Sequence, residues 1–163
     1  MKGNKLNIND PMPEFKNLPC VDGKKYSSSN FNDVNILIIV FSCNHCPYVK
    51  AYEDRMIAVQ KDYSDRGVQL VAINSNDERN YPDDNFDEMI KRAKAKEFNF
   101  KYLRDVDQQT AEAFGATHTP QFLFTFNPFS HGYKSQFKIS SLAMILCMFF
   151  FCEKFSSNGF CIN

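Results

Sequence analysis

The feature that most restricts how this chain can fold is a run of six apolar residues that leads directly into a pair of cysteines. Residues 36–41 read Ile-Leu-Ile-Ile-Val-Phe. Short continuous apolar runs rich in β-branched residues are typical of parallel strands that are buried on both faces. Cys43 and Cys46 follow at once, in a Cys-x-x-Cys arrangement. The run therefore predicts a central strand that ends beside two thiols.

Alternating strand and helix patterns surround this run. Pro47 suits the first turn of a helix, and apolar residues follow it at helical spacing up to Val59, before Gly67. The Asp-Gly pair at 22–23 predicts the turn of a hairpin over 15–26. The other predicted elements are a strand at 68–73, a helix at 84–95, a short strand at 102–103, a helix from Asp107 to Phe114-Gly115, and a strand at 121–126. This order predicts an α/β fold whose central sheet is flanked by helices.

The composition restricts the classes of partner. The length of 163 residues suits one domain, and 19 Lys and Arg residues balance 19 Asp and Glu residues. We therefore expect neither nucleic acid nor a membrane as a main partner, because no net charge attracts a polyanion or an anionic surface. Residues 1–7 lack the apolar segment of a signal peptide, so a cytoplasmic location is expected. Thiols stay reduced there, and a Cys-x-x-Cys pair then indicates catalysis or metal binding.

The predicted position of the two cysteines indicates redox chemistry. Reactive groups collect at the carboxyl ends of strands in such sheets, and a helix start lowers the pKa of a thiol because its free N–H groups favour negative charge. The Cys43 thiol is expected to have a lowered pKa and to attack a partner disulfide. Cys46 is expected to resolve the mixed disulfide that forms. His45 lies between them, where an imidazolium would stabilise the Cys43 thiolate. The alternative for His45 is a solvated turn residue.

Three segments carry a resemblance to a known family. They read Phe-Ser-Cys-Asn-His-Cys-Pro-Tyr-Val at 41–49, Val-Ala-Ile-Asn-Ser-Asn at 71–76 and Gly-Ala-Thr-His-Thr-Pro at 115–120. Together they resemble the thioredoxin-like superfamily, in its redoxin (AhpC/TSA and TlpA-like) branch, over residues 10–126. The resemblance implies a thioredoxin-like fold with a central mixed sheet and an N-terminal β-hairpin. It also implies a cis bond before Pro120, beside the cysteines, with the Thr119 backbone docking the substrate.

The same resemblance implies a thiol–disulfide oxidoreductase that needs no organic cofactor. Its partners would be dithiol or disulfide proteins, or glutathione. His45 is similar to the histidine of protein disulfide isomerase and DsbA, which implies a redox potential of roughly −150 to −230 mV. Peroxidases of this branch have a proline and a Ser or Thr where this chain has Ile36 and Val40. Efficient peroxidase activity at Cys43 is therefore not expected.

Several positions depart from the thioredoxin pattern or fall outside it. Ser42 replaces the tryptophan before the first cysteine, and residues 35–41 contain no acid that could carry a proton. Glu53 is expected to be a solvated helix charge rather than a base, and the Asp and Lys residues around 84–97 to form a solvated face. The Asn-Ser-Asn-Asp stretch at 74–77 is expected to be a turn, with lining of the site as the alternative.

Residues 127–163 differ from the rest of the chain. They hold seven Phe and three of the six cysteines, and their apolar run at 142–151 is too short to span a bilayer. The family continues at this point with a strand and a C-terminal helix. Either this tail is an alternative end of a truncated redoxin, or it folds back as a substitute strand and helix. Outside the Cys-x-x-Cys pair, the cysteines are expected to be incidental apolar residues: Cys20, Cys147, Cys152 and Cys161.

Two other functions stay open at this point. A metal-binding module could use Cys43, Cys46 and His118, because soft thiolates with one imidazole suit copper(I) or zinc. His118 would otherwise contact the substrate or be a polar loop residue. The third possibility is an inactive, truncated redoxin. Near-stoichiometric metal after purification would favour the first of these alternatives, and an uncooperative thermal melt would favour the second.

Overall fold

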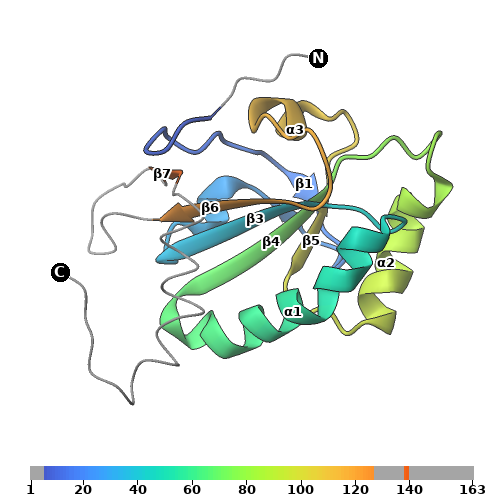
Figure 1. Cartoon of the computed structure of the whole chain (residues 1–163), viewed down its shortest axis with the longest axis horizontal. Helices are drawn as coiled ribbons and strands as arrows, with labels where there is room; N and C mark the ends of the chain where they lie inside the picture. The colour runs from blue at the N-terminus through green and yellow to red at the C-terminus, as the bar shows by residue number, and fades with distance from the viewer. Residues whose placement is uncertain (1–5, 127–137, 140–163) are drawn as a thin grey trace.

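A mixed five-stranded sheet forms the centre of the computed structural model, which describes residues 6–126 and 138–139. The strand order is β5-β4-β3-β6-β7. Strands β3, β4 and β5 are parallel, whereas β6 is antiparallel to β3 and β7 is antiparallel to β6 (Figure 1). Their bounds are Ile36–Ser42 for β3, Val68–Asn74 for β4, Lys101–Arg104 for β5, Gln121–Phe126 for β6 and Lys138–Ile139 for β7.

Strand β3 lies at the middle of the sheet, as its apolar run predicts. Its side chains alternate between two cores: Leu37 and Ile39 belong to one hydrophobic cluster, and Ile38 and Val40 belong to the other. Val40 is fully buried and pairs with Ala72 on one side and Phe122 on the other. The prediction of a strand buried on both faces is confirmed.

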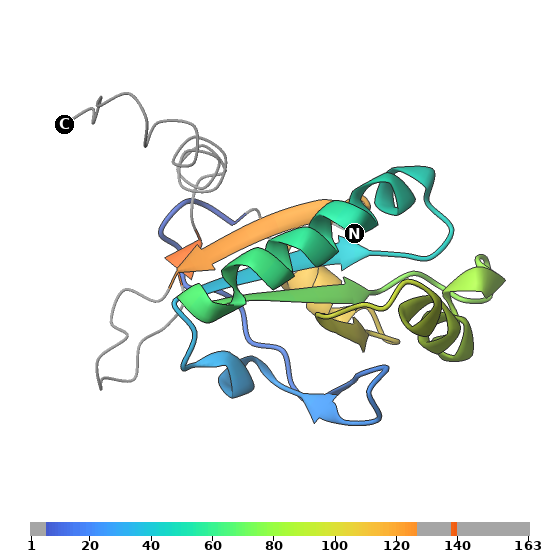
Figure 2. The same cartoon turned by 90° about the horizontal axis from the view of Figure 1, so that it is seen from below.

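The helices and the hairpin cover the two faces of the sheet. Helices α1 (Pro47–Tyr63) and α2 (Phe86–Ala95) lie on one face, and Figure 2 shows α1 lying along the strands. Helix α3 (Gln109–Ala113) lies on the opposite face (Figure 1). The hairpin strands β1 (Leu18–Pro19) and β2 (Lys25–Tyr26) are antiparallel. Three short 3-10 helices complete the described elements: η1 (Ser28–Phe31), η2 (Ser64–Arg66) and η3 (Pro82–Asp84). The α/β fold with a flanked mixed sheet and an N-terminal hairpin is confirmed.

Glu53 is not a solvated helix charge, and that prediction is wrong. Its side chain is only 2% exposed. Both of its carboxylate oxygens accept hydrogen bonds from the Arg92 guanidinium, at 2.7 and 2.6 Å. A second ion pair, between Asp54 and Lys96 at 3.1 Å, also joins α1 to α2. Helix α1 therefore turns this acidic residue towards α2 rather than towards water.

Two helix starts differ from the expected ones. Helix α2 begins at Phe86, because residues 82–84 form η3 instead. Asp84 is fully buried there, so the expected solvated face does not include it. Helix α3 begins at Gln109 rather than at Asp107, and the Asp107 carboxylate accepts a hydrogen bond from the Gln109 backbone N–H at 3.2 Å. The buried Asp105 carboxylate accepts from the backbone N–H groups of Thr110 and Ala111, at 3.3 and 3.0 Å.

The N-cap residue Asn85 provides a direct test that α2 begins at Phe86. The Asn85 side chain accepts a hydrogen bond from the Glu88 backbone N–H at 2.9 Å. Replacing Asn85 by Ala should lower the free energy of unfolding by about 1 kcal/mol, because an end N–H loses its partner. Asn85→Asp should retain most of the stability, since a carboxylate makes the same bond. Urea denaturation of the three chains gives the comparison, and equal losses in both variants would contradict the capping role.

The tail is described only at β7, where Ile139 pairs with Thr125 and Lys138 with Phe126. The other predictions for residues 127–163 lie outside the described residues, and both alternatives for the tail remain predictions. The incidental roles of Cys147, Cys152 and Cys161 fall there too. Within the described ranges, none of the helices has the length and apolar character that a bilayer crossing requires.

Candidate active site

The sheet brings the Cys-x-x-Cys pair and the segment before Pro120 together. Cys43 directly follows β3, and Cys46 occupies the N-cap position of α1. Because β6 runs antiparallel to β3, with Phe41 opposite Gln121, the residues before β6 lie beside the end of β3. The Thr119-Pro120 peptide bond is cis, as the resemblance implies. Both sequence-distant parts of the expected site therefore meet at the carboxyl end of β3.

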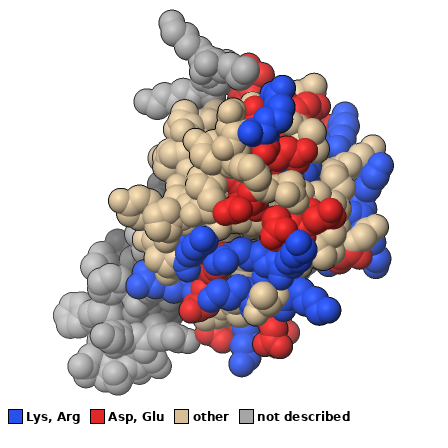
Figure 3. Space-filling view, turned by 90° about the vertical axis from the view of Figure 1, so that its right-hand side faces the viewer, with Lys and Arg blue, Asp and Glu red and all other residues tan. Residues whose placement is uncertain are grey.

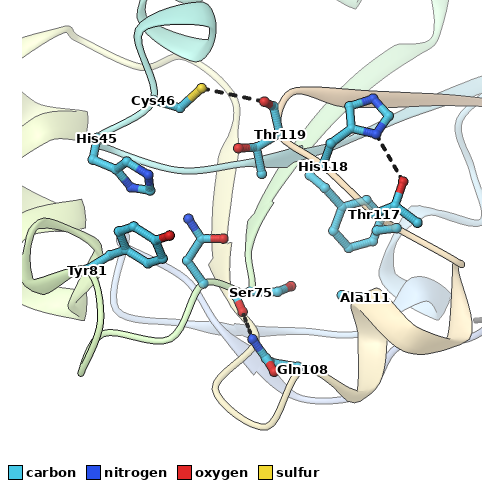
Figure 4. Close-up of a pocket in the computed structure, with 12 residues that line it drawn as sticks. His45, Cys46, Ser75, Tyr81, Gln108, Ala111, Thr117, His118 and Thr119 are labelled. Atoms are coloured by element: carbon cyan, nitrogen blue, oxygen red, sulfur yellow. Dashed lines mark hydrogen bonds between the residues drawn. The ribbon is translucent and has the colours of Figure 1, made fainter. Parts of the chain in front are cut away.

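Both thiols contact Thr119, but from different environments. The Cys43 Sγ lies 3.2 Å from the Thr119 hydroxyl, and the Cys46 Sγ donates a hydrogen bond to the Thr119 carbonyl at 3.5 Å (Figure 4). Cys43 is 1% exposed, whereas Cys46 is partly exposed. Neither forms a disulfide in this structure. The less buried of the two is therefore the second cysteine of the motif.

The expected lowering of the Cys43 pKa is wrong. Burial raises the pKa of this thiol, and hydrogen bonds from the Thr119 hydroxyl and the Cys46 backbone N–H offset only part of that increase. The negative charge of Asp84 raises it further. The physical reason for the difference is that α1 begins at Pro47. The helix start therefore lies next to Cys46, while Cys43 directly follows the buried end of β3.

The Thr119 hydroxyl should have a measurable influence on Cys43. Thr119→Val removes a bond that lowers the Cys43 pKa, so this pKa should rise further above its ordinary value. A raised thiol pKa stabilises the fold below the unfolded-state pKa, and that contribution is lost as the pH rises through the folded-state value. Mass-mapped labelling of Cys43 by methyl methanethiosulfonate across pH measures the shift. Thr117→Val is the matched control, and an unchanged Cys43 profile in Thr119→Val would contradict this contact.

His45 is held from two sides. Its Nδ1 lies 2.6 Å from a carboxylate oxygen of Asp84, and its ring stacks on Tyr81 with centroids 4.3 Å apart and planes within 1°. About a third of the side chain, 33%, is exposed. His45 is therefore not a freely solvated turn residue. Its expected action on a thiol remains a prediction.

Asp84 is the residue of this site that the sequence reasoning missed. Its carboxylate is fully buried and accepts four hydrogen bonds, two at each oxygen. The donors are the Asn44 backbone N–H at 2.5 Å, Asn74 Nδ2 at 3.2 Å, Asn76 Nδ2 at 2.9 Å and His45 Nδ1. The sequence shows Asn74 and Asn76 as part of a polar stretch after a strand. It contains no signal that these side chains hydrogen-bond to Asp84, which the pattern places in the following helix.

A cavity of about 350 Å³ opens beside these residues (Figure 4). It is lined by residues of several loops: Phe41, His45, Cys46, Ser75, Asn76, Tyr81, Gln108, Ala111, Ala116, Thr117, His118 and Thr119. Cys46 is in this lining and Cys43 is not. Ser75 and Asn76 confirm the alternative that the 74–77 stretch lines the site. His118 lines it as well, with its Nδ1 3.1 Å from the Thr117 hydroxyl.

The cavity lining contains no Lys, Arg, Asp or Glu. Figure 3 faces the side of the molecule on which the parallel strands end and shows acidic and basic side chains next to an uncharged area. Such a lining offers hydroxyl, amide and imidazole groups to a ligand, without a formal charge that attracts one sign.

A metal site would need other ligands than those expected. Among the described residues, the donor atoms that cluster within 4.8 Å belong to Cys43, His45 and Asp84, and His118 is not one of them. Both Asp84 oxygens already accept two hydrogen bonds each. An ionised carboxylate has about four acceptor positions, so a metal ion would have to displace protein donors from this one. The donor set therefore fits a hydrogen-bonded carboxylate better than a metal ligand.

Most of the chain matches one family of proteins. The sequence model of the AhpC/TSA family matches residues 8–146. The chain belongs to the AhpC/TSA family. Membership confirms the resemblance that segments 41–49, 71–76 and 115–120 indicated, and it makes the protein a redoxin. The comparison with curated proteins finds no match for this AhpC/TSA protein.

Solved structures agree with the family assignment. An uncharacterized conserved protein from Geobacillus kaustophilus is 35% identical, with a TM-score of 0.72 over 77% of this chain and 67% of its own. A hypothetical protein from Sinorhizobium meliloti 1021 is 28% identical, with a TM-score of 0.73 over 83% of this chain and 70% of its own. The thioredoxin domain of a thiol-disulfide oxidoreductase from Bacteroides vulgatus shares the fold, with a TM-score of 0.66 at 10% identity over 85% and 90% of the two chains. The AhpC/TSA protein thus has a thioredoxin-like fold.

Proposed function

We propose that this redoxin is a thiol–disulfide oxidoreductase that exchanges a Cys43–Cys46 disulfide with thiols of a partner. The observation that carries the proposal is the placement of both thiols against Thr119, at 3.2 and 3.5 Å, beside an open cavity. The family and the thiol-disulfide oxidoreductase fold relative support oxidoreductase chemistry in general. The exchange of this particular pair is our own assignment.

Within this function the geometry favours an order of attack opposite to the expected one. Cys46 lines the cavity and occupies the N-cap position of α1, so a partner sulfur can reach it. Cys43 is buried outside the cavity lining, and burial raises its pKa. We therefore assign the first attack to Cys46. Cys43 then resolves the mixed disulfide from the buried side.

The cycle balances without a further reagent. The Cys46 thiolate attacks one sulfur of a partner disulfide, so a Cys46–partner bond forms and the other partner sulfur leaves as a thiolate. The Cys43 thiolate then attacks Cys46, a Cys43–Cys46 bond forms, and the second partner sulfur leaves. Two electrons pass from the protein dithiol to the partner, and the two thiol protons end on the two partner sulfurs. The reverse sequence oxidises a partner dithiol.

The cavity favours protein partners over glutathione. Glutathione carries two carboxylates, and the cavity lining contains no Lys or Arg to pair with them. An extended protein segment has no such charges along its backbone and can lie beside the Thr119-Pro120 segment. We place the protein in the cytoplasm as part of this proposal. The cytoplasmic glutathione poise of about −220 to −320 mV would keep the Cys43–Cys46 pair mostly reduced.

A redox titration tests the proposal. The chain is equilibrated in glutathione buffers of graded potential, quenched in acid, alkylated and mapped by mass spectrometry at Cys43 and Cys46. We expect one reversible two-electron transition confined to that pair, at roughly −150 to −230 mV. Cooperative urea unfolding of the same sample shows that the chain is folded. A folded chain without a reversible Cys43–Cys46 couple would reject the function, and a potential below about −260 mV would reject the tuning by His45.

A further inference from the structure

We propose that the cavity beside Cys46 contains a subsite for an aliphatic side chain of the partner, at the residue next to the reacting half-cystine. The subsite is formed by Phe41, Ala111 and Ala116, three apolar residues of the cavity lining. It rests on the proposed exchange function, and it names the class of segment that this function selects. The preferred partner carries leucine or a similar aliphatic residue beside its disulfide.

The end of helix α3 fixes the two alanines of the subsite side by side. Gly115 follows the helix with a positive φ of 61°. Its N–H donates to the Glu112 carbonyl at 3.0 Å, and the Ala116 N–H donates to the Ala111 carbonyl at 2.9 Å. These two bonds form a Schellman motif, in which the side chains at the Ala111 and Ala116 positions commonly make a hydrophobic contact. Because both positions hold alanine, only two methyl groups fill the space that larger side chains would occupy.

Phe41 provides the third apolar surface of the subsite. It is 2% exposed, and its ring packs on Phe114 with centroids 5.7 Å apart. Both phenylalanines belong to one hydrophobic cluster, and Ala111 and Ala116 pack against the same cluster. The subsite is thus a part of the protein core that opens into the cavity, and packing on that core fixes its shape.

The subsite lies at one end of the cavity. Figure 4 shows Ala111 and Thr117 at this end, whereas His45 and Tyr81 lie at the other. Thr119 lies between the two ends in this view, and its carbonyl accepts the hydrogen bond from the Cys46 thiol. The whole cavity measures about 350 Å³. A partner sulfur that reaches Cys46 therefore brings the neighbouring residue of its segment into the same cavity.

Several polar groups around this end of the cavity already have partners. The Thr117 N–H donates to Gln121 Oε1 at 2.9 Å, and the Thr117 hydroxyl lies 3.1 Å from His118 Nδ1. The Gln108 amide donates to the Ser75 carbonyl at 2.8 Å. Since the lining contains no Lys, Arg, Asp or Glu, a charged side chain would lose water here without gaining a counter-charge. An aliphatic side chain has no such loss, and it gains from burial against the three apolar residues.

Peptide disulfides test the subsite directly. The probes are symmetric disulfides of the peptides Gly-Xaa-Cys-Gly-Gly and Gly-Gly-Cys-Xaa-Gly, blocked at both ends, with Gly, Leu or Asp as Xaa. The reduced full chain is mixed with excess peptide disulfide, quenched in acid, alkylated and mapped by mass spectrometry at Cys43 and Cys46. Each second-order rate constant is divided by that of dithiothreitol with the same peptide, which removes differences in the intrinsic reactivity of the disulfides.

Three variants locate the selectivity within the chain. Ala111→Leu and Ala116→Leu each fill the subsite with an aliphatic side chain of the protein itself. Ala113→Leu is the matched control, because Ala113 is exposed on the same helix and does not line the cavity. Leucine is a good helix former, so the changes in α3 are compatible with the helix. Cooperative urea unfolding of each variant shows that it is folded.

In the parent chain, we expect the leucine peptide to react about tenfold faster than the glycine peptide in at least one of the two series. The aspartate peptide should react no faster than the glycine peptide. In Ala111→Leu and Ala116→Leu, the ratio of the leucine to the glycine rate constant should fall to about twofold or less, because the subsite is already filled. Ala113→Leu should keep the ratio of the parent chain.

Other results would overturn the subsite and leave the exchange function in place. Equal rate constants for the leucine and glycine peptides in both series of the parent chain would do so, and this comparison needs no variant. A faster aspartate peptide, or an equal fall of the ratio in Ala113→Leu, would also do so. If none of the peptides gives a Cys43–Cys46 disulfide in the folded parent chain, the exchange function itself is rejected, and the subsite with it.

Discussion

Replacing Cys46 by Ser should abolish disulfide exchange, whereas replacing Cys43 by Ser should give a protein that captures its partner. Cys46 lines the cavity, and its loss removes the sulfur that a partner can reach. Without Cys43, the first attack still occurs but the mixed disulfide cannot be resolved. Reduction of a model disulfide protein followed over time should therefore fall to the level of the chain-free reaction in both variants. Only Cys43→Ser should form a covalent adduct.

The adduct itself shows which cysteine attacks first. Non-reducing gels and peptide mapping should place the partner on Cys46 in the Cys43→Ser chain, and reducing agent should release it. Cys20→Ser is the control, because Cys20 is a free, buried core thiol that does not line the cavity and should leave exchange unchanged. A stable adduct on Cys43 in the Cys46→Ser chain would show that the order inferred from burial is wrong.

Replacing Arg92 by Leu should lower the free energy of unfolding by about 3 kcal/mol or more. The change leaves the Glu53 carboxylate, 2% exposed, without the guanidinium that both of its oxygens contact. Breaking a buried ion pair from one side typically costs about 3–5 kcal/mol, because a charge stays buried without a partner. Urea denaturation with a common slope measures the loss.

The neighbouring residue offers a matched control. Lys91 pairs with Glu88 at 2.6 Å, but its side chain is 70% exposed. Lys91→Leu should therefore change stability by less than about 1 kcal/mol. Removing both charges in Glu53→Gln with Arg92→Leu should restore part of the loss. Similar losses for Lys91→Leu and Arg92→Leu would indicate that the Glu53–Arg92 pair contributes no more than a surface contact.

The sequence predicts those features that depend on local pattern. Continuous apolar runs locate β3 and β4 within one residue, and the strand expected at 121–126 is β6 itself. Pro47 opens α1, and Gly115 has the positive φ of 61° expected after a helix. These features arise from hydrophobic periodicity and from the restricted backbone of Pro and Gly. The resemblance adds the cis bond before Pro120, which composition cannot reveal.

Features that depend on distant partners were not predictable in this way. Glu53 is buried because Arg92, 39 positions away, reaches it. Asp84 looked like part of a solvated helix, yet its partners come from the loop before α1 and from the end of β4. The burial of Cys43 depends on packing in which Thr119, 76 positions later, takes part. For Glu53 and Asp84, the polar pattern predicts a solvated side chain because the counterpart lies on another element.

The contacts between residues 45–54 and residues 84–96 have a mechanical consequence. His45–Asp84, Glu53–Arg92 and Asp54–Lys96 join the same two stretches of chain at three successive points. These three contacts hold the two stretches together along their length. If the 43–46 loop is displaced when its sulfurs form a disulfide, these contacts would move residues 84–96 with it.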